Sequence, residues 1–228
     1  MNESVDHPPS EETPAEATTP AGPAFPWPPR PGTSVLSAFA ETWVESVFRP
    51  ARFFAAMPHD GFGSALSYYL PISIMGSALM MFWRGVLVAL GFADVIETFE
   101  GQPYNPGGEL VEFLLSPLTA TVYLLIAAGL THIGLKVVGA ASAKFMATLR
   151  VNAFASGPQL FLAVPLLGIP ASVVWVFVLI VVGLREVHHT TTGRAIAALL
   201  LPIAVLTILV MFTIVAAIVL GAMAVSRP

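Results

Sequence analysis

The sequence of 228 residues contains no cysteine. This absence excludes disulfides, thiol catalysis and metal sites with cysteine ligands, and it leaves the redox compartment undetermined. Charge is scarce as well, since Asp, Glu, Lys and Arg make up 11% of the chain whereas 56% of it is hydrophobic. A soluble domain of this length needs far more charge to cover its surface. The composition therefore predicts an integral membrane protein, and we expect no cofactor.

Signals for export and for catalysis are also missing. The N-terminus lacks both a basic start and an early apolar core, so no cleavable signal is predicted. The chain has no phosphate-binding loop, no serine-hydrolase elbow, no zinc-protease helix and no DNA-binding pattern. Glu186, His188 and His189 resemble a metal site only superficially, because adjacent histidines point to different faces of a helix. We therefore expect a protein that is not an enzyme and that binds neither metal nor nucleic acid.

Residues 1–32 are predicted to be a disordered, proline-rich tail. They hold nine of the 20 prolines, together with acidic and small residues and almost nothing apolar before Phe25. Such a segment cannot bury enough surface to fold alone. Its end, from Ala24 to Pro31, is predicted to be an extended, polyproline-like chain. This end is either a solvated spacer, the reading that we favour, or a ligand for a proline-binding domain.

Residues 33–60 change character, because apolar side chains now recur at helical spacing. Phe39 and Trp43 belong to this apolar stripe, and glutamates occupy the other face. Pro50 then breaks the helix and suits the first turn of a second helix that runs to Met57. We predict two short amphipathic helices, which either lie in the headgroup region or pack against the inner loops of the protein itself.

Apolar runs of about 18 residues or more are typical of membrane spans, and the remainder of the chain, residues 61–228, is predicted to be an all-α bundle of five such spans. The third and fourth segments are only marginally long enough to cross a bilayer, with a tight turn expected at Gly168–Pro170. They form either two true spans, the reading that we favour, or a re-entrant hairpin that enters from the inner face. The predicted spans are residues 65–92, 111–138, 151–168, 169–184 and 195–225.

The sparse cations predict the orientation of these spans. Arg49 and Arg52 precede the first span, whereas the loop at 93–109 carries four acidic residues and no Lys or Arg. Because cytoplasmic loops are enriched in Lys and Arg, this alternation places the N-terminus in the cytoplasm and the C-terminus on the far side. The expected location is a multi-pass position in a cell membrane, in particular a bacterial cytoplasmic membrane.

A polar island at residues 183–195 separates two apolar runs, and it must leave the bilayer because lipid cannot satisfy its backbone and charges. Together with the other basic groups of the inner side, it forms a candidate surface for anionic lipid headgroups or for a cytosolic or membrane protein partner. Each such cation contributes on the order of 1 kcal/mol to headgroup binding. The candidate residues are Arg49, Arg52, Lys144, Arg150, Arg185, His188 and Arg194.

Ionisable groups inside a span need a partner or an escape to water. Arg84 lies toward the outer end of the first span and Glu112 begins the second, so we predict either an ion pair between them or an arginine that extends outward to water. His132 lies near the inner end of the second span, about 30 Å from Glu112 by helical rise. We expect this histidine to have a local hydrogen-bond partner rather than to form a relay with Glu112.

Several pieces of the chain resemble, in register, the Yip-domain family, named for Ypt/Rab-GTPase-interacting proteins. The match runs from about Val47 to Pro202 and beyond and excludes the tail, and the order of the pieces is more specific than any one of them. At Asp60–Ser64 the chain departs from the Asp-Leu-Tyr-Gly-Pro element of animal and fungal members. The pieces are VFRPARFFAAMP, ALSYYL, LLSPL, KFMATLRVNAFASGPQLFLAVPLLG and GLREVHHTTTGRAIAALLLP.

This resemblance implies five membrane helices, a cytosolic N-terminus and no catalytic residue, and the composition rich in Ala and Pro and poor in Lys fits a bacterial member. The first functional hypothesis is a non-enzymatic scaffold or membrane-organising factor that acts through its cytosolic face. The second is a small permease or channel that uses Arg84, Glu112 and His132 around a midplane cavity. The sequence leaves the partner and oligomerisation open.

Overall fold

A computed structural model describes residues 25–225, and their side chains except those of residues 99–100 and 220–225. Every regular element in this part of the chain is helical, which confirms the all-α class. The elements are α1 (Val35–Phe48), α2 (Pro50–Ala55), α3 (Phe62–Ala89), α4 (Ala93–Glu100), α5 (Pro106–Val137), α6 (Phe145–Phe154), the 3-10 helix η1 (Gly157–Ala163), α7 (Gly168–Val187) and α8 (Thr192–Val225).

Four of the described helices, α3, α5, α7 and α8, are long and apolar enough to cross a membrane. Their bounds lie within about five residues of the first, second, fourth and fifth predicted spans. The expected multi-pass membrane protein is thus confirmed in its main elements. Residues 25–225 do not contain five helices of this kind, because the third predicted span is not a single helix.

Residues 151–168 are divided among the end of α6, η1 and the start of α7. The helix α6 ends at Phe154, and Ser156-Gly157-Pro158 leads into a tighter 3-10 turn because proline supplies no backbone N–H. The turn before α7 lies at Pro165–Leu167, slightly earlier than the predicted Gly168–Pro170 turn. An apolar run of this length does not reveal whether lipid or protein covers it, and here the protein covers most of α6.

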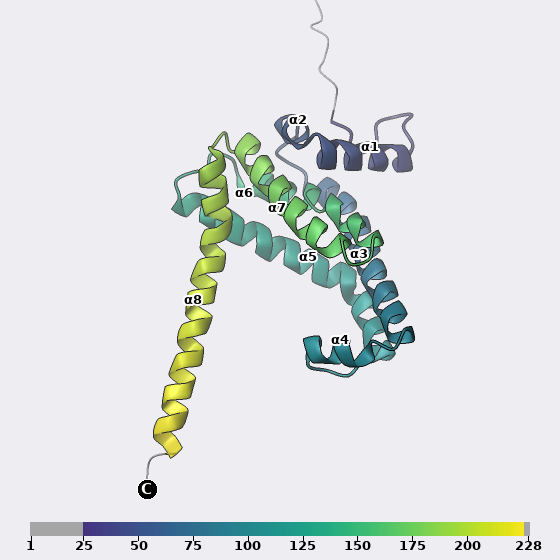
Figure 1. The fold of residues 1–228 in the computed structure, drawn as a ribbon. Helices are drawn as coiled ribbons and strands as arrows, with labels where there is room; N and C mark the ends of the chain where they lie inside the picture. Colours follow the sequence, from purple (N-terminus) through teal and green to yellow (C-terminus); the bar gives the residue numbers. More distant parts are fainter. Residues whose placement is uncertain (1–24, 226–228) are drawn as a thin grey trace, which may run out of the picture.

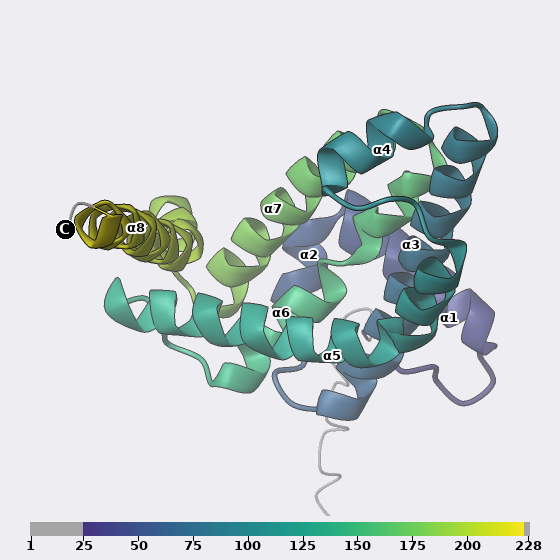
Figure 2. The ribbon, with the colours of Figure 1, turned by 90° about the horizontal axis from the view of Figure 1, so that it is seen from below.

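The helix α6 is the centre of the packed core. Every residue from Ala147 to Phe154 is buried, and α6 contacts α3, α5 and α7. Figure 1 shows α1 and α2 at one end of the molecule and α4 at the other. In the view of Figure 2, α8 is seen nearly end-on while α5 and α7 run across the picture, so both are strongly inclined to α8.

The end of the predicted tail, residues 25–32, packs against this core rather than remaining in solvent. Trp27 is buried, and its indole N–H donates hydrogen bonds to the Ser64 carbonyl at 2.8 Å and to the Ser67 hydroxyl at 3.1 Å. The Phe25 ring lies 4.8 Å from that of Phe53. Aromatic burial therefore fixes a segment whose prolines suggested a spacer. Residues 1–24 lie outside the described residues.

The boundary between α1 and α2 follows the local sequence rules. The Ser34 hydroxyl accepts a hydrogen bond from the Ser37 N–H and so caps α1. Pro50 occupies the first turn of α2, as predicted, because its missing N–H is not needed there. The residues of α4, expected to be an irregular loop, instead form a short helix that ends at Gly101 in a left-handed conformation.

Close helix contacts depend on glycine at one position above all. A Cβ atom added to Gly134 on α5 would lie 1.9 Å from the Ala198 carbonyl oxygen on α8 and 2.8 Å from its carbonyl carbon. Only glycine therefore allows the two backbones to approach this closely. Beyond this contact α8 leaves the bundle: from Ile203 to Val219 all its residues are exposed except Ala216, which is half-buried.

Candidate functional site

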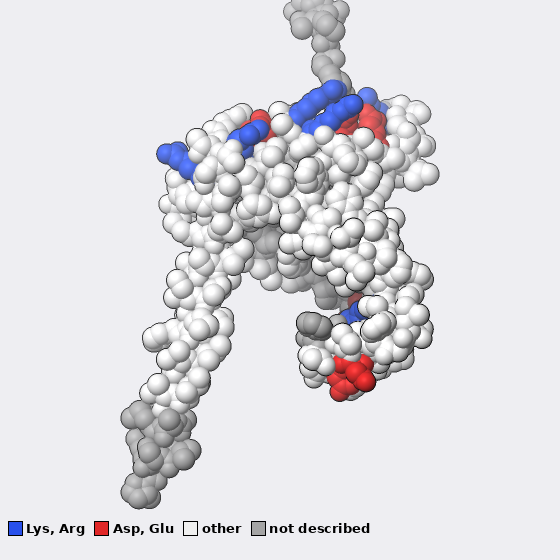
Figure 3. All heavy atoms as spheres, viewed as in Figure 1, with Lys and Arg blue, Asp and Glu red and all other residues white. Residues whose placement is uncertain are grey.

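Basic side chains gather at the end of the molecule that carries α1 and α2. Figure 3 shows Lys and Arg atoms there, with a few acidic ones among them, whereas Asp and Glu dominate the opposite end over α4. Arg49, Arg52, Lys144 and Arg194 are all exposed. We call these four residues and the half-buried Arg185 the basic end. Five of the seven candidates predicted from the sequence thus lie at the surface.

Two of these cations carry an acidic neighbour. The Arg49 guanidinium lies 2.7 Å from the Glu45 carboxylate one helical turn earlier, and Arg185 lies 2.5 Å from Glu186. An exposed ion pair of this kind contributes only about 0–1 kcal/mol to stability, so an anionic ligand can compete with the glutamate for the arginine. Among the described residues, no ion pair involves Arg52, Lys144 or Arg194.

An apolar stripe adjoins these cations on α1. Leu36, Val44 and Phe48 share one face of the helix and are 78%, 43% and 60% exposed. The opposite face packs inward, with Ala38, Thr42 and Ser46 buried. Trp43 lies at the boundary between the two faces, where its indole N–H donates to the Gly157 carbonyl at 2.9 Å. Exposed apolar groups beside cations are typical of a surface that meets a bilayer or a protein.

Arg150 differs from the prediction, because its side chain is 1% exposed and is absent from the basic end. Its Nη1 donates to the Gly61 carbonyl at 2.8 Å and to the Ser64 hydroxyl at 2.6 Å, and so holds the start of α3. The guanidinium also lies over the rings of Phe25 and Phe154, 5.9 and 5.2 Å from their centroids. Burial lowers the pKa of Arg150, and the negative charge of Asp60 opposes this shift.

His188 is also buried, and it forms a hydrogen-bonded chain with Thr148 and His132. The Ala143 N–H donates to His188 Nδ1 at 3.1 Å, so the proton of the neutral ring lies on Nε2, which is 2.9 Å from the Thr148 hydroxyl. That hydroxyl lies 2.9 Å from His132 Nδ1 and can donate to it. The chain joins α5, α6 and the end of α7, and it confirms that His132 has a hydrogen-bond partner of its own.

The buried His188 makes stability depend on pH. Burial, together with smaller contributions from the neighbouring His132, His59 and His189, lowers its pKa to about 4. As the pH falls through about 6.5 the unfolded chain takes up a proton, while the folded ring stays neutral until about pH 4. The contribution of neutral His188 to the free energy of unfolding is therefore fully present above pH 6.5. It is lost between pH 6.5 and pH 4, which lowers the free energy of unfolding by a few kcal/mol.

The measurement is the unfolding temperature of the detergent-solubilised protein between pH 4 and 7.5. We expect His188→Gln to flatten the decline, because glutamine does not titrate. The matched control is His189→Gln, which changes an exposed neighbour and should leave the slope as it is. Equal slopes in the wild-type protein and in His188→Gln would contradict this assignment.

The intramembrane pair predicted between Arg84 and Glu112 has a different partner. Arg84 Nη2 lies 2.7 Å from Glu109 Oε1, three residues before Glu112 on the same helix. Glu112 lines the same cavity, whereas His132 lines a separate hollow near Lys144. The structure therefore does not bring Arg84, Glu112 and His132 together around one midplane cavity, as the permease hypothesis requires.

Sequence reasoning missed the hydroxyl groups that connect or line these sites. Thr148 links two histidines, and Ser73 and Ser116 are buried beside the cavity of Arg84. Serine and threonine in apolar helices commonly bond to their own backbone, so the sequence alone gave no reason to single them out.

Comparison with known proteins agrees with this architecture. A family model described as the Yip1 domain matches residues 44–223. No curated protein and no solved structure matches the chain. The matched stretch covers more than three quarters of the sequence, 180 of 228 residues, and it contains every helix from α2 to α7. The chain therefore belongs to the Yip1 domain family of membrane proteins.

Proposed function

We propose that this chain is a non-enzymatic membrane protein that organises the bilayer around it by binding anionic lipid headgroups at its basic end. The observation that carries the proposal is the juxtaposition of exposed cations with an exposed apolar stripe on α1. Cations near a membrane surface attract anionic headgroups, and apolar side chains beside them enter the boundary between headgroups and acyl chains. The Yip1 domain match supports a membrane role.

The test compares binding of phosphatidylglycerol to the purified chain and to the triple variant Arg49→Ala, Arg52→Ala, Arg194→Ala. Each removed cation costs about 1 kcal/mol, so the dissociation constant should rise roughly a hundredfold. The control is Glu97→Gln on α4, which changes charge at the opposite end. Binding by the wild-type protein should also weaken as salt is raised. A triple variant that binds like the wild-type protein would refute the proposal.

For topology, we propose three full passages, α3, α5 and α8, and a re-entrant hairpin made of α6, η1 and α7. Both arms of the hairpin touch α1: the Trp43 indole bonds to Gly157, and the Trp175 indole N–H donates to the Val47 carbonyl at 2.9 Å. Beyond these contacts η1 adds seven residues, or about 14 Å, roughly half of a 30 Å hydrocarbon core. With the cations on the inside, the N-terminus is cytoplasmic and the C-terminus lies on the far side.

The hairpin tip supports this arrangement because it is apolar throughout. Leu166 and Leu167 are 88% and 70% exposed. If the tip lay in water, both apolar side chains would be exposed to solvent. Because the chain lacks cysteine, single thiols report their position without background. We expect Ile169→Cys to react with a membrane-impermeant maleimide from neither side of intact cells. Gly107→Cys should react from outside only, and labelling of Ile169→Cys from outside would establish five passages instead.

A further inference from the structure

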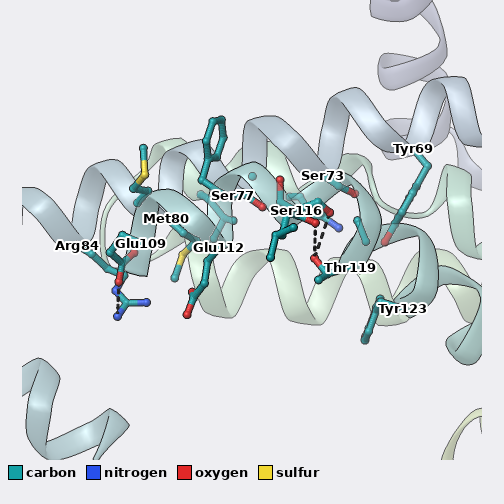
Figure 4. Close-up of a pocket in the computed structure, with 17 residues that line it drawn as sticks. Tyr69, Ser73, Ser77, Met80, Arg84, Glu109, Glu112, Ser116, Thr119 and Tyr123 are labelled. Carbon is teal, nitrogen blue, oxygen red and sulfur yellow. Dashed lines mark hydrogen bonds and ion pairs between the residues drawn. The ribbon is translucent and has the colours of Figure 1, made fainter. Parts of the chain in front are cut away.

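A cavity of about 720 Å³ lies between α3 and α5, with η1 along one side (Figure 4). Its volume falls in the range typical of ligand sites. Along α3 it extends from Tyr69 to Arg84, a distance of about 22 Å by helical rise. The cavity is therefore long enough for part of an extended lipid molecule.

Charged groups converge at one end of this cavity. The ion pair of Arg84 and Glu109 lies there, and Glu112 lies one turn further along α5. Within the part of the chain that the structure describes, the Glu112 carboxylate has no hydrogen bond or ion pair, and its residue is exposed. The side chains of one arginine and two glutamates carry a formal charge of −1, which favours a ligand with a cationic group.

Two buried hydroxyl groups line the cavity further along the helices. The residues Ser73 and Ser116 are each 6% exposed, and neither Oγ atom has a hydrogen-bond partner among the described residues. A buried polar atom without a partner destabilises the fold, so both positions favour an external group that is a hydrogen-bond donor or acceptor. Figure 4 shows both side chains beside the cavity.

The cavity is open toward the apolar surroundings of the helices. Leu115 and Tyr123, which line it, are 48% and 69% exposed, and Met80 is 37% exposed. In a chain whose helices α3 and α5 qualify as membrane spans, lipid covers such side chains. A ligand that enters from this flank brings acyl chains with it, which excludes a purely water-soluble occupant.

We propose that this cavity binds one phospholipid whose headgroup combines a primary ammonium with a phosphate, of the phosphatidylethanolamine class. The ammonium donates hydrogen bonds to the Glu112 carboxylate, and the phosphate accepts from Arg84, whose guanidinium has five N–H donors and so serves Glu109 at the same time. Ser116 lies four residues after Glu112 on α5, about 6 Å along the helix axis, so its hydroxyl donates to an ester carbonyl of the lipid. Ser73 lies eleven residues before Arg84 on α3, about 16 Å along that helix, beside the part of the cavity that the acyl chains fill.

The experiment is native mass spectrometry of the delipidated full-length chain, titrated separately with phosphatidylethanolamine, phosphatidylcholine and phosphatidylglycerol that carry identical acyl chains. The expected result is one phosphatidylethanolamine per chain, bound about tenfold more tightly than phosphatidylcholine, whose quaternary ammonium cannot donate a hydrogen bond to Glu112. Glu112→Gln should remove this preference, whereas the control Glu97→Gln should keep it. Equal binding of phosphatidylethanolamine and phosphatidylcholine, or a preference between them that survives Glu112→Gln, would overturn the proposal.

Ser116→Ala provides a second variant that separates binding from folding. It removes a buried hydroxyl that has no partner, so the lipid-free variant should unfold at a temperature no lower than that of the wild-type protein, while its affinity for phosphatidylethanolamine falls severalfold. Unchanged affinity in this variant would count against the site. The triple variant of the basic end should bind phosphatidylethanolamine normally, so this inference and the proposed function fail or succeed separately.

Discussion

Arg150→Ala is expected to lower the free energy of unfolding by about 3 kcal/mol or more. The substitution removes a fully buried side chain, two hydrogen bonds to the segment that starts α3 and two ring contacts. Gly61, which that segment contains, has a φ of 105°, a backbone conformation that glycine tolerates and that the arginine holds in place. Without the hydrogen bonds of Arg150, the start of α3 is no longer fixed to α6.

Thermal unfolding in detergent, followed by tryptophan fluorescence, measures the effect of Arg150→Ala. Arg150→Met should restore part of the loss, because it refills the space without the charge and its Nε, which has no partner in the described structure. The control Arg52→Ala removes an exposed arginine and should change the unfolding temperature little. If Arg150→Ala unfolds at the same temperature as Arg52→Ala, the assigned role of Arg150 is wrong.

Gly134→Ala should destabilise the chain by about 2–3 kcal/mol, although alanine normally favours a helix. The added Cβ meets the backbone of Ala198 at 1.9 Å, and backbone atoms cannot rotate away as a side chain does. The helices α5 and α8 must therefore separate, and α8 loses much of the contact that joins it to the bundle. Limited proteolysis and the unfolding temperature both report this separation.

Gly129→Ala is the matched control for Gly134→Ala. It lies on the same helix, and a Cβ atom there would meet nothing within 4 Å. Helix propensity alone then applies, so Gly129→Ala should stabilise the chain by up to about 1 kcal/mol. Opposite signs for the two alanine variants are the expected result, and equal signs would contradict the close packing of α5 on α8.

Most of the fold followed from hydrophobic runs, because lipid demands long helices wherever backbone crosses it. The ends of α3, α5, α7 and α8 were predicted to within about five residues. The segment at 151–168 was misassigned, because an apolar run that is covered by protein looks like one covered by lipid. The proline-rich end of the tail was predicted to be a solvated spacer because of its prolines. The burial of one aromatic side chain, Trp27, instead holds this segment against the core.

The candidate site was less accessible to prediction than the fold. Charge alternation located most of the basic end, yet the same rule assigned Arg150 to the surface, since sequence does not show that Gly61 and Ser64 accept its hydrogen bonds. The partner of Arg84 was misplaced by one helical turn, from Glu109 to Glu112. Both carboxylates lie on nearly the same face of α5, and only the crossing of α3 and α5 selects between them.

The contact at Gly134 lies near the start of α8, and this position has a mechanical consequence. From Ala198 to Val219 the helix extends about 31 Å as a rod clamped at one end. A rotation of about 5° at the clamp displaces the far end by roughly 3 Å, while the packed core around α6 stays where it is. A change in the thickness of the surrounding bilayer would accordingly change the tilt of α8 before it changes the packing of the core around α6.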